Sequence, residues 1–125
     1  MPTSLPDEAL LARAREAREA AYAPYSGFRV GAALLTADGR VFTGCNIENA
    51  AFSPTCCAER VALFKAVSEG ARDFVAIAIA ADRAPCPPCG VCRQALVEFC
   101  APALRVVLEG EPCTLGGLLP QAFGL

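Results

Sequence analysis

Hydrophobic and polar positions along this chain follow two different spacings, which separate the predicted helices from the predicted strands. In residues 6–23, leucine and alanine recur every three or four positions, as on one face of a helix, and acidic residues occupy the first turn. Residues 28–36 and 41–45 are two apolar segments joined by an Asp-Gly turn, a pattern that predicts a β-hairpin. The first elements are therefore a helix and two antiparallel strands.

The later part of the chain alternates helices with buried strands. A polar loop over residues 46–55 precedes a helix that Ser53 or Thr55 is expected to cap and that closes at Gly70. In chain order, the predicted elements are then a helix over residues 56–69, a buried strand over 73–81, a helix over 90–100, a strand over 104–109 and a short C-terminal segment over 113–123. The order α-β-β-α-β-α-β, without a repeat or a linker, predicts a single α/β domain over residues 1–125, with a mixed sheet between helices.

Length and composition support one packed core. At 125 residues, with 54% hydrophobic and 19% charged residues, the chain is long enough for a single domain and too apolar for disorder. The mean hydropathy of +0.40 is high, yet the longest apolar run, residues 74–81, is much shorter than the roughly 18 residues of a membrane span. We expect the extra apolar surface to lie in contacts between subunits.

Charge and cysteine content restrict the partner and the compartment. The net charge is −2 and no basic block is present, which argues against nucleic acid and favours a small-molecule ligand. The N-terminal segment lacks a basic region followed by an apolar stretch, so no secretory signal is predicted. Eight cysteines without such a signal indicate thiols in a reducing cytoplasm, used for metal or redox chemistry, and their even number leaves a disulfide scaffold as the alternative.

The absence of histidine excludes several kinds of catalytic site. Without it the chain has no Ser-His-Asp or Cys-His machinery, no imidazole base and no His-ligated metal. A metal must therefore be bound by thiolates and carboxylates. A proton must be carried by Glu, Asp, Lys, Tyr or Cys.

Three cysteines lie where loops enter the second and third predicted helices. Cys57 lies in the first turn of one helix, and Cys89 and Cys92 flank the start of the other, where free backbone N–H groups favour the thiolate. Thiolate is the form that binds zinc, and three protein ligands leave the fourth position that catalytic zinc sites give to water. The overlapping spacing with Cys86 leaves open a redox C-x-x-C, an iron–sulfur run, or a structural zinc site closed by Cys86 or Cys56.

Charged and polar residues next to these cysteines complete the candidate site. Glu59, two residues after Cys57, can reach over a metal-bound water without binding the metal, and can act there as a general acid and base. Arg60 can hydrogen-bond the sulfurs and offset the negative charge of three thiolates, and Gln94 can support the ligands from the next helix.

Two segments of the chain resemble a known zinc motif. Thr-Cys-Cys-Ala-Glu-Arg at residues 55–60 and Pro-Pro-Cys-Gly-Val-Cys-Arg-Gln at residues 87–94 together resemble the motif of the small zinc-dependent cytidine deaminases. The resemblance extends over residues 22–123, including the closing Leu-Leu-Pro-Gln-Ala-Phe. It implies a three-layer α-β-α sandwich with a mixed five-stranded sheet, one zinc ion per chain, and a cytoplasmic homotetramer with shared active sites.

The resemblance also implies roles for individual residues. The implied zinc ligands are Cys57, Cys89 and Cys92, the proton shuttle is Glu59, and the substrate contacts are Phe28, Asn46, Glu48, the backbone of Ala58 and Phe123 from a neighbouring subunit. Asn46 and Glu48 would bind the ribose hydroxyls, and Phe28 would pack beside the nucleoside. The implied reaction is the hydrolytic deamination of free cytidine and deoxycytidine in pyrimidine salvage. A zinc-bound hydroxide attacks C4 of cytosine, Glu59 passes the proton through N3 to the amine, and ammonia leaves.

Three other functions would use the same residues, and the sequence argues against the last of them. Phe52, where many relatives have tyrosine, favours a different cytosine nucleoside, such as an antibiotic, as the substrate. A structural zinc module that binds a partner would need a fourth protein thiolate. Deamination of single-stranded nucleic acid would need a basic groove, which the sequence does not contain.

Overall fold

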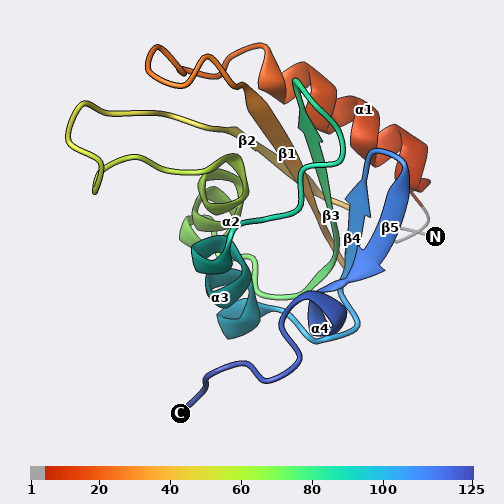
Figure 1. Cartoon of the computed structure of the whole chain (residues 1–125). Helices are drawn as coiled ribbons and strands as arrows, with labels where there is room; N and C mark the ends of the chain where they lie inside the picture. The colour runs from red at the N-terminus through yellow and green to blue at the C-terminus, as the bar shows by residue number, and fades with distance from the viewer. Residues whose placement is uncertain (1–4) are drawn as a thin grey trace.

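A mixed β-sheet forms the centre of the computed structural model, which describes residues 5–125 (Figure 1). The strands are β1 (Val30–Thr36), β2 (Val41–Cys45), β3 (Phe74–Ala81), β4 (Arg105–Leu108) and β5 (Glu111–Thr114). The helices are α1 (Asp7–Arg18), α2 (Ala58–Ser68), α3 (Gly90–Phe99) and α4 (Leu115–Leu118). The strand order is β2-β1-β3-β4-β5, with β3 and β4 parallel and the other neighbours antiparallel.

Helices cover both faces of this sheet, which confirms the predicted three-layer arrangement (Figure 1). On one face, α1 packs against β1 and β3, and the buried residues of this layer include Leu10, Leu11, Ala14, Leu35 and Ala78. On the other face, α2 and α3 enclose a second set of buried residues, which includes Leu63, Leu96, Leu34, Ile77 and Val106. β1 is buried along its whole length because both of its faces are covered. In the edge strand β2, buried and half-buried residues alternate. The single-domain prediction covers residues 1–125, of which residues 1–4 lie outside the described part.

The sequence pattern missed one strand. Only four strands are predicted from hydrophobic runs, but β5 pairs antiparallel with β4 through a tight turn at Gly110, where φ is +96°. Glycine adopts this left-handed conformation without the steric cost that a side chain brings. The strand has four residues and includes Pro112, so it carries no apolar signal of its own.

Two helix boundaries differ from the predicted ones. α1 ends at Arg18 and not near residue 23, because the backbone N–H of Tyr22 donates to the carbonyl of Asn46 at 2.9 Å and draws the chain toward the loop after β2. The predicted cap of α2 is wrong, since Cys57 is the N-cap residue and no side chain caps the helix. The Thr55 hydroxyl instead accepts a hydrogen bond from the backbone N–H of Asn49 at 3.0 Å.

Three chain segments meet at one end of the sheet, where β1 begins and β2 and β3 end. β1 runs antiparallel to both of its neighbours, so its start at Val30 and Gly31 pairs with the ends of β3 and β2, at Ala81 and Cys45. The segment before β1, the loop after β2 and the loop after β3 therefore converge there. The loop after β2 leads into α2 and the loop after β3 leads into α3, so the N-termini of both helices lie at this same end of the sheet.

Candidate active site

The sulfur atoms of Cys57, Cys89 and Cys92 come together at the N-termini of α2 and α3. Cys57 is the N-cap residue of α2, Cys89 is the N-cap residue of α3, and Cys92 lies in the first turn of α3. The Sγ atoms of Cys57 and Cys89 are 3.8 Å apart, those of Cys89 and Cys92 are 3.5 Å apart, and all three lie within 4.8 Å of one another. The sequence prediction that these cysteines from separate segments share one place is confirmed.

The spacing of the three sulfurs fits a zinc ion. Tetrahedral Zn–S bonds of about 2.3 Å place ligand sulfurs about 3.8 Å apart, close to the separations found here. Within residues 5–125, Cys56 and Cys86 line the neighbouring cleft but do not belong to this sulfur group. The group can therefore supply three of the four ligands of a tetrahedral zinc ion, which is the number typical of catalytic sites.

Two thiols in the sulfur group have pKa values shifted in opposite directions. Hydrogen bonds from the Cys92 thiol and from the Arg60 guanidinium lower the pKa of Cys57 to about 5. The pKa of Cys92 is raised, because its thiol donates to Cys57 and is buried. The Nη2 atom of Arg60 lies 3.5 Å from the Cys57 sulfur, as predicted for a cation that offsets the thiolates. Zinc needs deprotonated thiols, so the positive groups around Cys57 favour its binding.

A buried carboxylate lies in the first turn of α2, next to the sulfur group. Glu59 is 4% exposed, and burial raises its pKa to about 7. It lies outside the three-sulfur group and lines the neighbouring cleft. A carboxyl group with a pKa near neutrality can both take up and release a proton, which suits a general acid and base.

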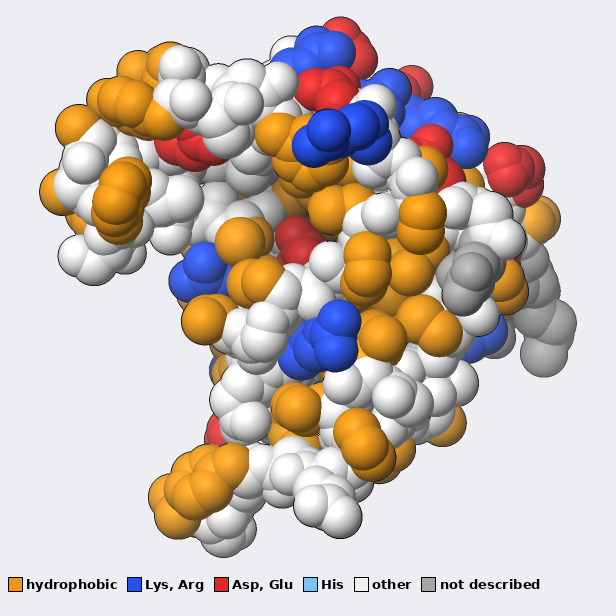
Figure 2. Space-filling view, in the orientation of Figure 1, with side chains coloured by type: hydrophobic (Ala, Val, Ile, Leu, Met, Phe, Trp, Pro, Cys, Tyr) orange, Lys and Arg blue, Asp and Glu red, His pale blue; other side chains and the backbone are white. Residues whose placement is uncertain are grey.

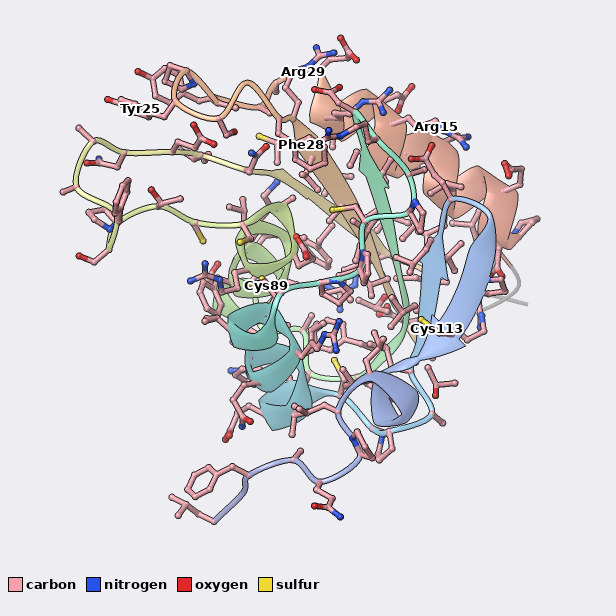
Figure 3. All side chains as sticks on the ribbon, viewed as in Figure 1. Arg15, Tyr25, Phe28, Arg29, Cys89 and Cys113 are labelled. Carbon is pink, nitrogen blue, oxygen red and sulfur yellow. The ribbon has the colours of Figure 1, made fainter. Side chains whose placement is uncertain are left out.

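A cleft of about 260 Å³ connects the sulfur group with the segment before β1. Its walls contain Cys57, Cys89 and Glu59. They also contain four of the five substrate contacts that the family resemblance implies, which are Phe28, Asn46, Glu48 and Ala58. Figure 3 shows Phe28 at the start of β1 and Cys89 at the start of α3, on either side of this space. Figure 2 shows a hollow on the same face, bordered by apolar side chains.

Asn46 and Glu48 hold the segment before β1 in place. The Oδ1 atom of Asn46 accepts from the backbone N–H of Val30 at 2.9 Å, and its Nδ2 atom donates to the carbonyl of Phe28 at 2.9 Å. The Glu48 carboxylate accepts from the backbone N–H groups of Tyr25 at 2.9 Å and Ser26 at 3.1 Å, and from the Ser26 hydroxyl.

One residue of the cleft wall, Ser26, was not predicted from the sequence. The Ser26 hydroxyl accepts a hydrogen bond from the backbone N–H of Phe28 at 3.0 Å, so it links Glu48 to the aromatic wall. Hydrogen bonds from Ser26 lower the pKa of Glu48, which keeps the carboxylate ionised. The only sequence signal for Ser26 is its place before Gly27, which has a φ of +67° in a tight turn.

Two predicted site residues lie away from the cleft in the chain itself. Gln94 was expected to support the zinc ligands, but its Nε2 atom donates to the carbonyl of Phe123 at 3.1 Å. The Phe123 side chain is 70% exposed and does not line the cleft. Figure 1 shows the C-terminal segment leaving α4 and running past α3, away from the sheet.

The fold and the sulfur group place this chain in the class of zinc-binding enzymes built on a three-layer α/β sandwich. The family model described as "Cytidine and deoxycytidylate deaminase zinc-binding region" matches residues 5–108. The chain therefore belongs to the cytidine deaminase family and is a zinc-dependent enzyme of that family.

Several similar proteins support this assignment. A cytidine deaminase of Sporosarcina psychrophila is 53% identical over 122 residues, which are 93% of this chain and 90% of the relative. The crystal structure of cytidine deaminase from Burkholderia pseudomallei has a TM-score of 0.91 and 50% identity, and the match covers 95% of this chain and 100% of that one. The crystal structure of cytidine deaminase from Mycobacterium tuberculosis has a TM-score of 0.91 and 41% identity, and the match covers 98% of this chain and 100% of that one.

None of the helices within residues 5–125 combines the length and the apolar character that crossing a membrane requires.

Proposed function

We propose that this protein catalyses the hydrolytic deamination of free cytidine and deoxycytidine, giving uridine or deoxyuridine and ammonia. The observation that carries the proposal is the position of Glu59, which is buried in the cleft wall beside three converging cysteines and is not one of them. The names of the similar proteins, which are cytidine deaminases, support this choice of substrate. Pyrimidine salvage in the cytoplasm is the proposed setting, where cysteine thiols stay reduced.

The proposed deamination uses a metal ion to activate water and a carboxylate to carry protons. Zinc held by Cys57, Cys89 and Cys92 would act as a Lewis acid that lowers the pKa of a water molecule and so activates it for attack on C4 of cytosine. Glu59 takes the proton that this water loses and delivers it to N3, and then transfers the hydroxyl proton of the C4 adduct to the exocyclic amine. The C4–N bond then breaks, ammonia leaves and the carbonyl of uracil forms. Arg60 keeps the charge of the three thiolates partly neutralised.

The pyrimidine and the ribose would occupy opposite parts of the cleft. Ala58 is the first residue of α2, where a backbone N–H has no acceptor within the helix, and it can donate to the carbonyl of cytosine. Phe28 provides an apolar wall beside the nucleoside. Asn46 and Glu48 are placed to bind the ribose hydroxyls while holding the segment that carries Phe28.

Replacing Glu48 with Gln is expected to raise KM for cytidine about tenfold, since a hydrogen bond to a charged group contributes about 1.5–3 kcal/mol. The change of kcat should be small, because the ribose contact acts on substrate and transition state alike. Steady-state kinetics measure the two constants, and Glu16→Gln on the exposed side of α1 serves as the control. An unchanged KM would contradict the ribose role of Glu48.

A comparison of substrates tests the proposal directly. Cytidine and deoxycytidine are expected to be turned over faster than free cytosine, which lacks the ribose, and faster than cytidine 5′-phosphate, whose charge the acidic cleft disfavours. A nucleoside antibiotic with a cytosine base tests the second candidate substrate, which Phe52 suggests. If that compound has a much higher kcat/KM than cytidine, the proposed substrate is wrong while the reaction class stands.

We further propose a homotetramer in which active sites are shared. Exposed apolar side chains support subunit contacts, and they include Tyr22, Tyr25, Phe52, Phe64, Val91 and Phe123. Phe123 is exposed and does not line the cleft of its own chain, which supports its insertion into the site of a neighbouring subunit.

The sharing of Phe123 predicts complementation between two defective variants. Phe123→Ala is expected to lower kcat/KM about tenfold, since burial of an aromatic side chain contributes about 1.5–3 kcal/mol. Glu59→Gln subunits retain Phe123 but lack the proton carrier. Mixed tetramers of the two variants should therefore regain activity, which a titration of one variant into the other measures. Activity that falls in proportion to the added Glu59→Gln subunits would contradict shared sites.

A further inference from the structure

Gly44 lies where the sheet meets the first turn of the helix that carries Cys57 and Glu59. It is a buried residue near the end of β2, on the side that packs against α2. A Cβ atom at this position would lie 2.5 Å from the backbone nitrogen of Ala62 and 2.6 Å from the carbonyl oxygen of Ala58. Both atoms belong to the α2 backbone, so no side-chain rotation can relieve the contact.

The size of this conflict can be related to the geometry of the site. Ordinary Cβ contacts begin at 3.4 Å, so a methyl group at Gly44 is about 1 Å too close to α2. Ala58 lies between Cys57 and Glu59, and its carbonyl oxygen is one of the two backbone atoms that would have to move. A shift of α2 away from β2 would carry Cys57 away from the two cysteines on α3, because Cys89 and Cys92 are held by a different helix.

We propose that Gly44 is a positioning residue, whose missing side chain sets the depth of α2 against the sheet and thereby the place of Cys57 and Glu59. The inference rests on the proposed function of those two residues. In this proposal, the contact between α2 and β2 holds Cys57 and Glu59 at the correct distance from the two cysteines of α3.

The chain offers a matched control on the opposite face of the sheet. A Cβ atom at Gly31 would lie 2.0 Å from the carbonyl oxygen of Ala14 and 2.4 Å from the backbone nitrogen of Arg18, both in α1. Gly31→Ala therefore brings a conflict at least as severe as Gly44→Ala, but against a helix that carries no residue of the site. A general loss of packing affects both variants, whereas displacement of the site affects only one.

The test compares wild type, Gly44→Ala and Gly31→Ala by zinc affinity, by the absorption spectrum of bound Co²⁺ and by kcat. For Gly44→Ala we expect a zinc affinity about tenfold lower and an altered thiolate–Co²⁺ spectrum. Its kcat should fall about 100-fold, the effect expected of a 1 Å displacement. Gly31→Ala should lose thermal stability but keep the wild-type affinity, spectrum and kcat.

Three results would overturn the proposal: Gly44→Ala with wild-type zinc affinity and spectrum, equal losses in both variants, or failure of Gly44→Ala to fold. The zinc measurements do not depend on turnover. A wild-type protein that binds zinc but deaminates no cytidine would therefore contradict the proposed function, while the affinities and spectra still decide the role of Gly44.

Discussion

Replacing Glu59 with Gln is expected to lower kcat for cytidine about 10³-fold, within the range that general acid–base catalysis contributes. The amide has nearly the shape of the carboxyl group but can neither accept nor deliver the proton that the reaction moves. No other carboxylate, among the described residues, lies in both the cleft wall and the α2 helix. Steady-state assays of the zinc-loaded variant measure the loss.

The control for this prediction separates chemistry from folding. The variant should bind one zinc ion per chain and unfold at nearly the wild-type temperature, because Glu59 lies outside the sulfur group and its burial as a charged group is costly. Glu16→Gln, at an exposed position of α1, should leave kcat unchanged. If Glu59→Gln retained wild-type turnover, the protein could not use Glu59 as its proton carrier.

Replacing Cys89 with Ser should reduce zinc affinity more than about 100-fold and abolish deamination. The loss exceeds that expected from a residue that only supports a ligand, since the serine hydroxyl does not supply the thiolate that zinc prefers. Zinc content after dialysis and the unfolding temperature with and without added zinc both report the effect, because a bound metal stabilises the folded state.

Cys86→Ser provides the matched control, since this cysteine lies in the same loop and lines the same cleft but stays outside the sulfur group. It should keep both zinc and activity. Loss of zinc from Cys86→Ser would indicate a closed, four-thiolate structural site, and the interpretation as a catalytic centre would then fail.

The zinc site could be predicted from sequence because its parts are local motifs at helix starts. The Cys57-Ala58-Glu59 segment and the Cys-x-x-C pair each lie within one turn of a helix, so their spacing indicated candidate ligands, although it left Cys56 and Cys86 as alternatives. The meeting of the two segments depends on the strand directions, which the sequence pattern did not specify. The resemblance to the cytidine deaminases then identified the metal and the proton carrier.

Other features depend on contacts that no local pattern contains. The clamp formed by Asn46 and Glu48 holds backbone groups about twenty residues earlier in the chain, and Ser26 takes part only because a tight turn brings it there. β5 is too short to give a periodic signal. Gln94 faces the C-terminal segment and not the sulfurs, because one turn of helix α3 cannot direct Cys92 and every neighbouring side chain to the same place.

We propose that this protein removes ammonia from cytidine by means of Glu59 and a zinc ion held by Cys57, Cys89 and Cys92. The most direct test incubates the zinc-loaded protein with cytidine and follows the loss of its absorbance together with the release of ammonia, with Glu59→Gln measured in parallel. We predict one ammonia for each uridine formed by the wild type and almost none by the variant. No turnover by a wild-type protein that contains one zinc ion per chain would contradict the claim.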